Sequence, residues 1–148
     1  MFDRARFIAD LYSLAEREVP WRHQGTSPET GMDCVGSLRW AFERQLALPR
    51  ALADEFSAYH RPPDGWHMYD VLKRFFIEID PKDARPSDLY QIFIRKNPCH
   101  IAVKISDDNP PLIAEAFQSM EGSVSKFWIR PLDSRYRILS CFRIPDFA

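Results

Sequence analysis

The sequence predicts an α+β fold, with N-terminal helices packed on a C-terminal antiparallel β-sheet. Two observations predict it. Apolar residues recur at helical spacing in several segments before about residue 80. From Leu89 onward they fall instead in short β-rich runs separated by Asn, Asp, Pro and Gly. Helices followed by strands favour a sheet covered by helices on one face over alternating parallel units.

The first half of the chain is expected to form amphipathic helices. Their apolar residues recur at intervals of three or four, and proline marks where two of them end. The second helix begins at Asp33-Cys34, which places Cys34 in its first turn. A polar Gly- and Pro-containing loop precedes this helix, and a His-Arg-Pro-Pro-Asp-Gly turn precedes the last one. The expected helices cover about residues 3–18, residue 33 to before Pro49, a short piece within 50–56, and a segment from Val71 to Ile79.

The second half is expected to form a meander of antiparallel strands. Each run is rich in β-branched and aromatic residues, and turn-forming residues lie between the runs. The expected strands are 89–95, 99–105, 111–117, 126–132 and 136–144.

The composition fits one globular domain, residues 1–148, and argues against several classes of function. The 20 basic and 21 acidic side chains nearly cancel and form no basic block, so nucleic acid is not an expected partner. No apolar run approaches the roughly 20 residues that span a bilayer, and we expect cytoplasmic synthesis without a signal peptide. The three cysteines are far apart, which predicts reduced thiols rather than disulfides or a zinc site.

Cys34 is the candidate nucleophile. A thiol in the first turn of a helix faces unpaired backbone N–H groups and the positive end of the helix dipole, and both favour the thiolate. The alternative is that Cys34 is a small buried apolar residue, as free cysteines often are. Cys99 and Cys141, inside apolar strand runs, fit that alternative better.

His100 is the candidate base. Strand alternation in CHIAVKI places His100 on the face opposite Ile101 and Val103, so its ring leaves the apolar face and can point toward the helix that carries Cys34. The other three histidines lie in loops or at a helix entry. A lone strand histidine can equally be a structural hydrogen-bonding group.

A third residue is needed to fix the orientation of the imidazole, and PLIAEAFQ offers two. If the intervening hairpin is centred between Asp107 and Asp108, Glu115 lies opposite His100. If it is centred on Asn109, Gln118 takes that place.

These segments resemble a known family. VPWRHQGTSPETGMDCVGSLRWAF looks like the Cys-bearing segment of NlpC-type papain-like cysteine peptidases, particularly the cell-wall peptidases of the branch encoded with phage tail genes. Downstream, YHRPPDGWHMYDVLKRFF resembles the connector and helix of that branch, CHIAVKI its His strand, and LIAEAFQ the strand of its third residue. The resemblance covers about residues 18–145. Four features depart from it. The third residue is Glu115 instead of the usual His, Asn or Gln, and Ser87 replaces the Gly of a Pro-Gly-Asp signal. The Cys motif continues Gly36-Ser37 instead of the usual Gly-Leu, and Trp21 stands where many relatives have Tyr.

The resemblance implies a papain-like NlpC-type fold and a cysteine hydrolase. Cys34 would be the nucleophile, His100 the general base and later acid, and Glu115 the orienting residue, while Trp21 and Asp33 would contribute to substrate binding. Peptidoglycan stem peptide would be the substrate, phage tail proteins are possible partners, and no metal or organic cofactor is implied. Delivery would be by a virion tail or another route to the cell wall. A catalytically silent tail-assembly or host-contact module and an acyl- or amide-transferring enzyme are the alternatives.

Overall fold

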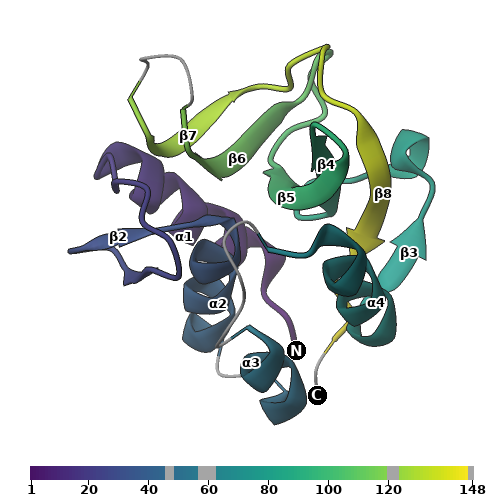
Figure 1. Cartoon of the computed structure of the whole chain (residues 1–148), viewed down its shortest axis with the longest axis horizontal. Helices are drawn as coiled ribbons and strands as arrows, with labels where there is room; N and C mark the ends of the chain where they lie inside the picture. Colours follow the sequence, from purple (N-terminus) through teal and green to yellow (C-terminus); the bar gives the residue numbers. More distant parts are fainter. Residues whose placement is uncertain (46–48, 57–62, 120–123, 147–148) are drawn as a thin grey trace.

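The helices lie along one side of a six-stranded antiparallel sheet in this computed structural model, which describes residues 1–45, 49–56, 63–119 and 124–146 (Figure 1). The helices are α1 (Arg4–Glu16), α2 (Cys34–Arg44), α3 (Arg50–Glu55) and α4 (Gly65–Phe75), with a 3-10 turn η1 (Pro81–Asp83). The strands are β1 (Thr26–Ser27), β2 (Gly31–Met32), β3 (Ile77–Ile79), β4 (Leu89–Ile94), β5 (Asn97–Lys104), β6 (Leu112–Phe117), β7 (Lys126–Pro131) and β8 (Ile138–Arg143). The predicted α+β class is therefore confirmed.

Aspartate side chains cap the three longer helices and so fix where each begins. Asp3 accepts a hydrogen bond from the Arg6 amide at the start of α1, and Asp33 accepts one from the Gly36 amide at the start of α2. Asp64 does the same at the start of α4. An N-cap carboxylate satisfies amides that have no partner inside the helix and favours the positive end of the helix dipole. Cys34 is consequently the first residue of α2.

The segment before α2 lies directly on that helix. A side chain at Gly36 would place its Cβ only 1.8 Å from the Gly25 carbonyl oxygen, so the contact requires glycine. The structure corrects the expected loop over residues 21–32, because it contains a short hairpin of β1 and β2 that pairs Thr26 with Met32. This hairpin holds the preceding residues over the start of α2.

The order of the sheet is β3-β8-β4-β5-β6-β7. Strands β4 to β7 form the expected meander, but β8 was expected to follow β7 at the edge and instead returns to pair with β4. This pairing covers a strand whose backbone groups would otherwise be left at the edge of the sheet. The strands expected from the sequence are all present, but the predicted position of the last strand in the sheet was wrong.

The helix expected from Val71 to Ile79 ends at Phe75. Phe76 has extended backbone angles, and the next three residues form β3, which pairs with β8. Apolar residues at 72, 75, 76 and 79 satisfy helical spacing, but Ile77 and Ile79 also satisfy the alternation of a strand. Pairing with β8 makes residues 77–79 a strand instead of the last turn of the helix. The predicted turn before α4 includes residues 60–62, which lie outside the described residues.

The core lies between the helices and one face of the sheet. Aromatic rings form its centre, and Phe7 of α1 stacks on Phe42 of α2 with a centroid distance of 5.5 Å. Side chains on the other face of the sheet, among them Tyr90 and Ile113, form a second and smaller cluster. Burial on both faces makes the central strands β4 and β5 a rigid support for residues at their ends.

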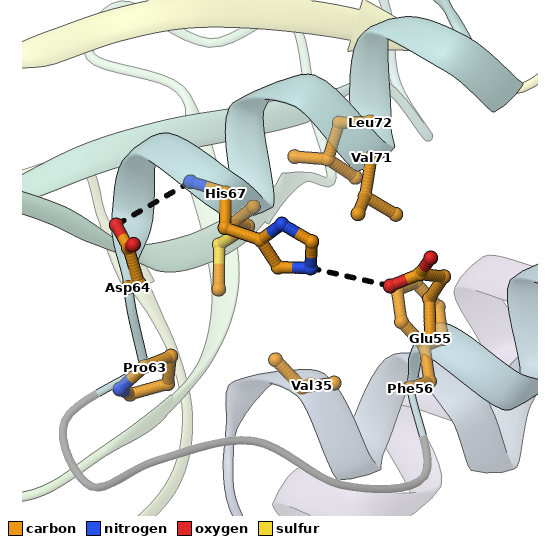
Figure 2. Close-up of a pocket in the computed structure, with 9 residues that line it drawn as sticks. Val35, Glu55, Phe56, Pro63, Asp64, His67, Val71 and Leu72 are labelled. Carbon is orange, nitrogen blue, oxygen red and sulfur yellow. Dashed lines mark hydrogen bonds and ion pairs between the residues drawn. The ribbon is translucent and has the colours of Figure 1, made fainter.

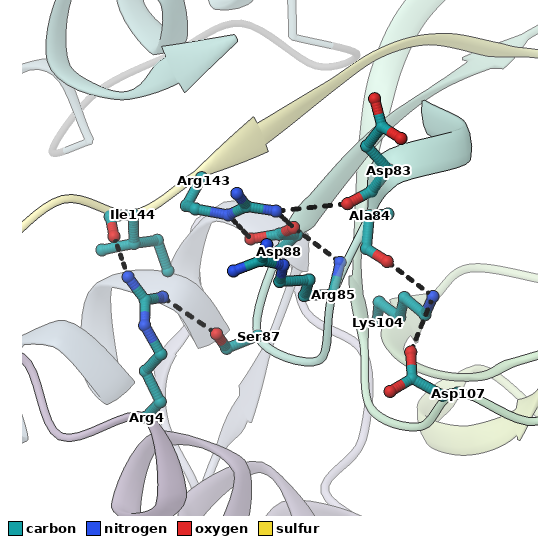
Figure 3. Close-up of polar contacts among 10 residues, drawn as sticks. All are labelled: Arg4, Asp83, Ala84, Arg85, Ser87, Asp88, Lys104, Asp107, Arg143 and Ile144. Carbon is teal, nitrogen blue, oxygen red and sulfur yellow. Dashed lines mark hydrogen bonds and ion pairs between the residues drawn. The ribbon is translucent and has the colours of Figure 1, made fainter. Parts of the chain in front are cut away.

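A polar network fixes the start of β4 (Figure 3). The buried Asp88 accepts two hydrogen bonds from the Arg143 guanidinium, at 3.1 and 2.8 Å, and one from the Arg85 amide at 2.7 Å. Ser87 adopts a left-handed φ of 81°, and its hydroxyl accepts a hydrogen bond from Arg4. The left-handed φ gives a physical reason for the glycine that the resembling family has at this position. The network ties β4 to β8 and to α1.

Candidate active site

A cavity of about 750 Å³ opens where the start of α2 meets one end of β5 and β6. Cys34 and His100 both line it. Trp21 and Asp33 line it from the segment before α2, and Gln118 lines it from beyond β6. The fold thus gathers the expected site residues, apart from Glu115, around one cavity, although they lie far apart in the sequence.

Cys34 is almost fully enclosed, with 8% of its surface exposed. Its thiol donates a hydrogen bond to the Cys99 carbonyl oxygen at a distance of 3.8 Å. Burial raises the pKa of the Cys34 thiol well above its usual range, and the neighbouring Asp33 carboxylate raises the pKa further. The helix N-terminus acts in the opposite direction. The Cys34 side chain is therefore a thiol at rest, and a base must remove its proton before it can act as a nucleophile.

The other two cysteines are also free and buried. Burial raises the pKa of Cys99, and it raises that of Cys141 to about 12. Cys141 belongs to the small core cluster, as a structural residue would. Cys99 differs from the expectation, because it lines the cavity beside Cys34.

His100 lies on β5 with 6% of its surface exposed. Its Nε2 atom is 3.5 Å from Oε1 of Glu115, whose side chain is fully buried. The imidazole ring also packs edge-on against Phe117 and Tyr136, with centroid distances of 6.0 and 6.2 Å. The carboxylate and the two aromatic rings restrict how the imidazole can turn.

The Glu115 carboxylate has two further partners. Arg130 donates a hydrogen bond to Oε1 at 3.0 Å, and the Tyr136 hydroxyl donates one to the same oxygen at 2.5 Å. Burial alone would raise the pKa of Glu115, but contacts with His100, Tyr136 and Arg130 outweigh it and lower that pKa. Glu115 is therefore a carboxylate, which can only accept hydrogen bonds.

The register between β5 and β6 differs from both predicted registers. Val103 pairs with Ala114 and Lys104 with Ile113, so Glu115 comes opposite Ala102 at the next step and not opposite His100. Because directly paired residues and their diagonal neighbours share one face, the Glu115 and His100 side chains still meet. The hairpin is centred between Asp108 and Asn109. The length of its loop sets this centre, and the sequence alone did not determine that length. Gln118 lines the cavity as well.

Trp21 and Asp33 take different positions at the cavity wall. Both oxygens of the buried Asp33 carboxylate accept backbone amides, Oδ1 from Gly36 and Oδ2 from Gln24, each at 2.8 Å. Asp33 thus holds the segment before α2 in place besides capping the helix. Trp21 is half-buried, and its backbone amide binds the Ser125 carbonyl.

Sequence reasoning missed several residues near the site. His23 lines the cavity, with its Nδ1 atom 3.9 Å from Oδ2 of Asp33. Arg95 and Lys96, in the β4–β5 turn, are exposed at the rim. The left-handed φ of 59° at Arg95 forms this turn. The sequence signal for it was the Asn and Pro that follow, which indicate a turn but not which cavity the turn borders.

A smaller cavity of about 50 Å³ lies between α2, α3 and α4 (Figure 2). Apolar side chains such as Val35 and Leu72 line most of it, and His67 at its edge binds the Glu55 carboxylate at 3.2 Å. The space suits no more than a few water molecules and includes neither Cys34 nor His100. The larger cavity is therefore the candidate site.

No group of three or more His, Cys, Asp and Glu side chains within the described residues is arranged to hold a metal ion. No helix in the same part of the chain is long and apolar enough to span a membrane.

Comparison with known proteins shows the fold. No protein-family model and no curated protein matches the sequence. Among solved structures, an NLP/P60-family protein similar to lipoprotein from Staphylococcus aureus superposes with a TM-score of 0.64 and 19% identity over 98% of this chain. NlpC2 from Trichomonas vaginalis gives 0.65 and 18% over 95%. The peptidoglycan hydrolase RipB from Mycobacterium tuberculosis gives 0.54 and 18% over 97%.

The chain spans 43% and 45% of the first two of these proteins and 67% of the third. At such low identity the likeness establishes a shared fold and does not transfer an activity. The predicted NlpC-type fold is confirmed: this chain folds as NlpC/P60 proteins do.

Proposed function

We propose that this chain is a cysteine hydrolase that cleaves an amide bond in peptidoglycan stem peptides. One observation carries the proposal: the Cys34 thiol and the His100 imidazole border the same cavity, and a buried carboxylate lies beside the imidazole. A thiol, a base and a residue that orients the base are the parts that thiol-based acyl transfer needs. The shared fold with a peptidoglycan hydrolase supports the substrate class by analogy.

The proposed reaction begins when His100 removes the proton from Cys34. The sulfur attacks the amide carbonyl carbon, and backbone N–H groups at the start of α2 stabilise the oxyanion, with the Trp21 indole as a further donor. The C–N bond breaks as His100 returns the proton to the leaving amine. Water then attacks the thioester, releases a carboxylic acid and restores the thiol. Each residue ends in its starting state, and no cofactor takes part.

The charge at the cavity rim supports an acidic peptide as substrate. Arg95 and Lys96 are exposed, and neither forms an ion pair with any residue in the described ranges. Among the described residues, the one acidic side chain that lines the cavity, Asp33, already binds backbone amides. A peptide with free carboxylates, such as a stem peptide, would therefore find cationic partners at the rim.

The burial of Cys34 favours one alternative, a catalytically silent module on the same fold. A thiol at 8% exposure with a raised pKa is also what an inert cysteine shows. Such a module would act in phage tail assembly or host contact, and the hydrolase itself could reach the cell wall from a virion tail. The two readings differ in whether His100 activates Cys34.

Digestion of purified muropeptides tests the proposal. The wild-type protein should release a new amine and a new carboxylate, identified by mass spectrometry, and Cys34→Ala should release neither. Incorporation of ¹⁸O from labelled water into the new carboxylate distinguishes hydrolysis from transfer to another amine. Equal alkylation rates of Cys34 in the wild-type protein and in His100→Ala, together with no cleavage, would favour the silent module.

A further inference from the structure

Two hydrogen-bond donors and the His100 ring converge on one oxygen of the Glu115 carboxylate. Arg130 binds Oε1 from β7, the Tyr136 hydroxyl binds it from the β7–β8 connection, and His100 Nε2 is 3.5 Å from it. The other oxygen, Oε2, is buried without a hydrogen-bond partner in the described structure. A carboxylate in this position needs strong compensation, because burying an unpaired charge is costly.

Arg130 supplies a permanent positive charge for this purpose. It is the one guanidinium within ion-pair distance of Glu115 among the described residues, and Glu115 raises its pKa further. The Arg130 guanidinium also lies over the rings of Phe117 and Trp128, at 4.9 and 5.1 Å. Its position is therefore fixed by packing as well as by charge.

The consequence for His100 depends on which groups face it. Glu115 favours the imidazolium form, while Arg130, paired with the same carboxylate, opposes it. Tyr136 is neutral, and its pKa is raised by burial and by Glu115. Cys34 and His23 share the cavity with His100, and the raised pKa of Cys34 keeps that group uncharged at rest. The balance between Glu115 and Arg130 thus controls whether the base is free to accept a proton.

We propose that Arg130 and Tyr136 are positioning residues that hold Glu115 as a carboxylate aimed at His100 and keep His100 available as a neutral base. This inference rests on the proposed function, in which His100 takes the proton of Cys34. It explains how a charged orienting residue can serve where the resembling family usually has a neutral one. Without Arg130, the buried pair of Glu115 and His100 would retain a proton to higher pH.

Titration of the histidine ring signals by NMR tests the inference without a substrate. The four histidines give few signals, and His100→Ala identifies the one from His100. In Arg130→Met, the midpoint of the His100 signal should rise by about one pH unit or more. In Glu115→Gln the midpoint should fall, because the carboxylate that favours the imidazolium form is gone.

Three control variants separate this role from a structural one. Arg130→Lys keeps the positive charge, so the midpoint of the His100 signal should stay close to that of the wild-type protein. Arg137→Met removes an exposed positive charge from the β7–β8 connection, where Arg137 lies over Phe93, and should leave the midpoint unchanged. Tyr136→Phe keeps the ring but removes the hydroxyl donor, and should raise the midpoint by less than Arg130→Met does.

The activity profile gives a second readout. Because the base must lose its proton before it can accept one from Cys34, the acid limb of kcat/KM in Arg130→Met should move to higher pH with the NMR midpoint. An unchanged midpoint in Arg130→Met, or an equal rise in Arg130→Lys, would overturn the inference. If the midpoint rises but no muropeptide is cleaved, the positioning role stands and the proposed hydrolase function fails.

Discussion

The buried ion pair at the start of β4 offers a sharp test of how the fold is held together. Asp88→Asn keeps the shape of the side chain but removes the charge that pairs with Arg143, and it places an NH₂ group where donors already converge. Asp88 is fully buried, while 25% of the Arg143 side chain is exposed. Breaking one partner of a buried pair costs about 3–5 kcal/mol.

The exposure of Arg143 allows water to replace part of what it loses, so we expect the lower end of this range, about 3 kcal/mol. For a chain of this length each kcal/mol lowers the melting temperature by about 2–4 °C, which predicts a fall of about 6–12 °C. Thermal unfolding followed by circular dichroism measures it. Asp88 does not line the cavity, so the activity per folded molecule should persist.

A second Asp–Arg pair provides the matched control. Asp133 also binds both sides of a guanidinium, that of Arg135, but 88% of the Arg135 side chain is exposed. Exposed pairs contribute little to stability, so Asp133→Asn should barely change the melting temperature. If the two substitutions lower it equally, burial does not decide the strength of these pairs and the reasoning is wrong.

Further predictions concern the site and the backbone. Cys34→Ala should abolish muropeptide cleavage while the melting temperature stays within a few degrees, and mass spectrometry of the products with a thermal scan checks both. His100→Ala should cost nearly as much kcat/KM as the loss of Cys34, since nucleophile and base act as a unit; a loss of only a few fold would refute the pairing. In urea unfolding, Ser87→Gly should be more stable than Ser87→Ala by about 1–2 kcal/mol. Both variants lose the hydroxyl, but only glycine adopts the left-handed backbone angles without strain. Equal unfolding midpoints would show that Ser87 is not strained. The double variant Arg95→Ala/Lys96→Ala should raise KM for carboxylate-bearing muropeptides about tenfold with little change in kcat, whereas an unchanged KM in steady-state assays would exclude a role for the cationic rim.

The sequence predicted well what depends on local pattern. The helix that carries Cys34 has an aspartate cap, an apolar stripe and a proline beyond its end, and each of these signals acts within a few residues. The strand of His100 was predicted for the same reason, because alternation fixes which side chains share a face. These two elements already define the nucleophile and base of the candidate site.

Contacts between distant segments could not be predicted. Nothing near β8 indicates that it returns to β4, since strand order depends on which edge the completed sheet leaves open. The hairpin register depends on loop geometry, which shifted the pairing of Glu115 away from both expected positions. Arg130 and Tyr136 follow Glu115 by 15 and 21 residues, and only the folded sheet brings them to its carboxylate.

The enclosed, protonated state of Cys34 has a consequence for how long the protein stays intact. Peroxides and other oxidants attack thiolates far more readily than thiols, and oxidation beyond the sulfenic acid is largely irreversible. A sulfur with 8% exposure that remains a thiol until a base removes its proton is protected while the site is idle. Under the proposed mechanism, damage would then accumulate with the number of turnovers rather than with time.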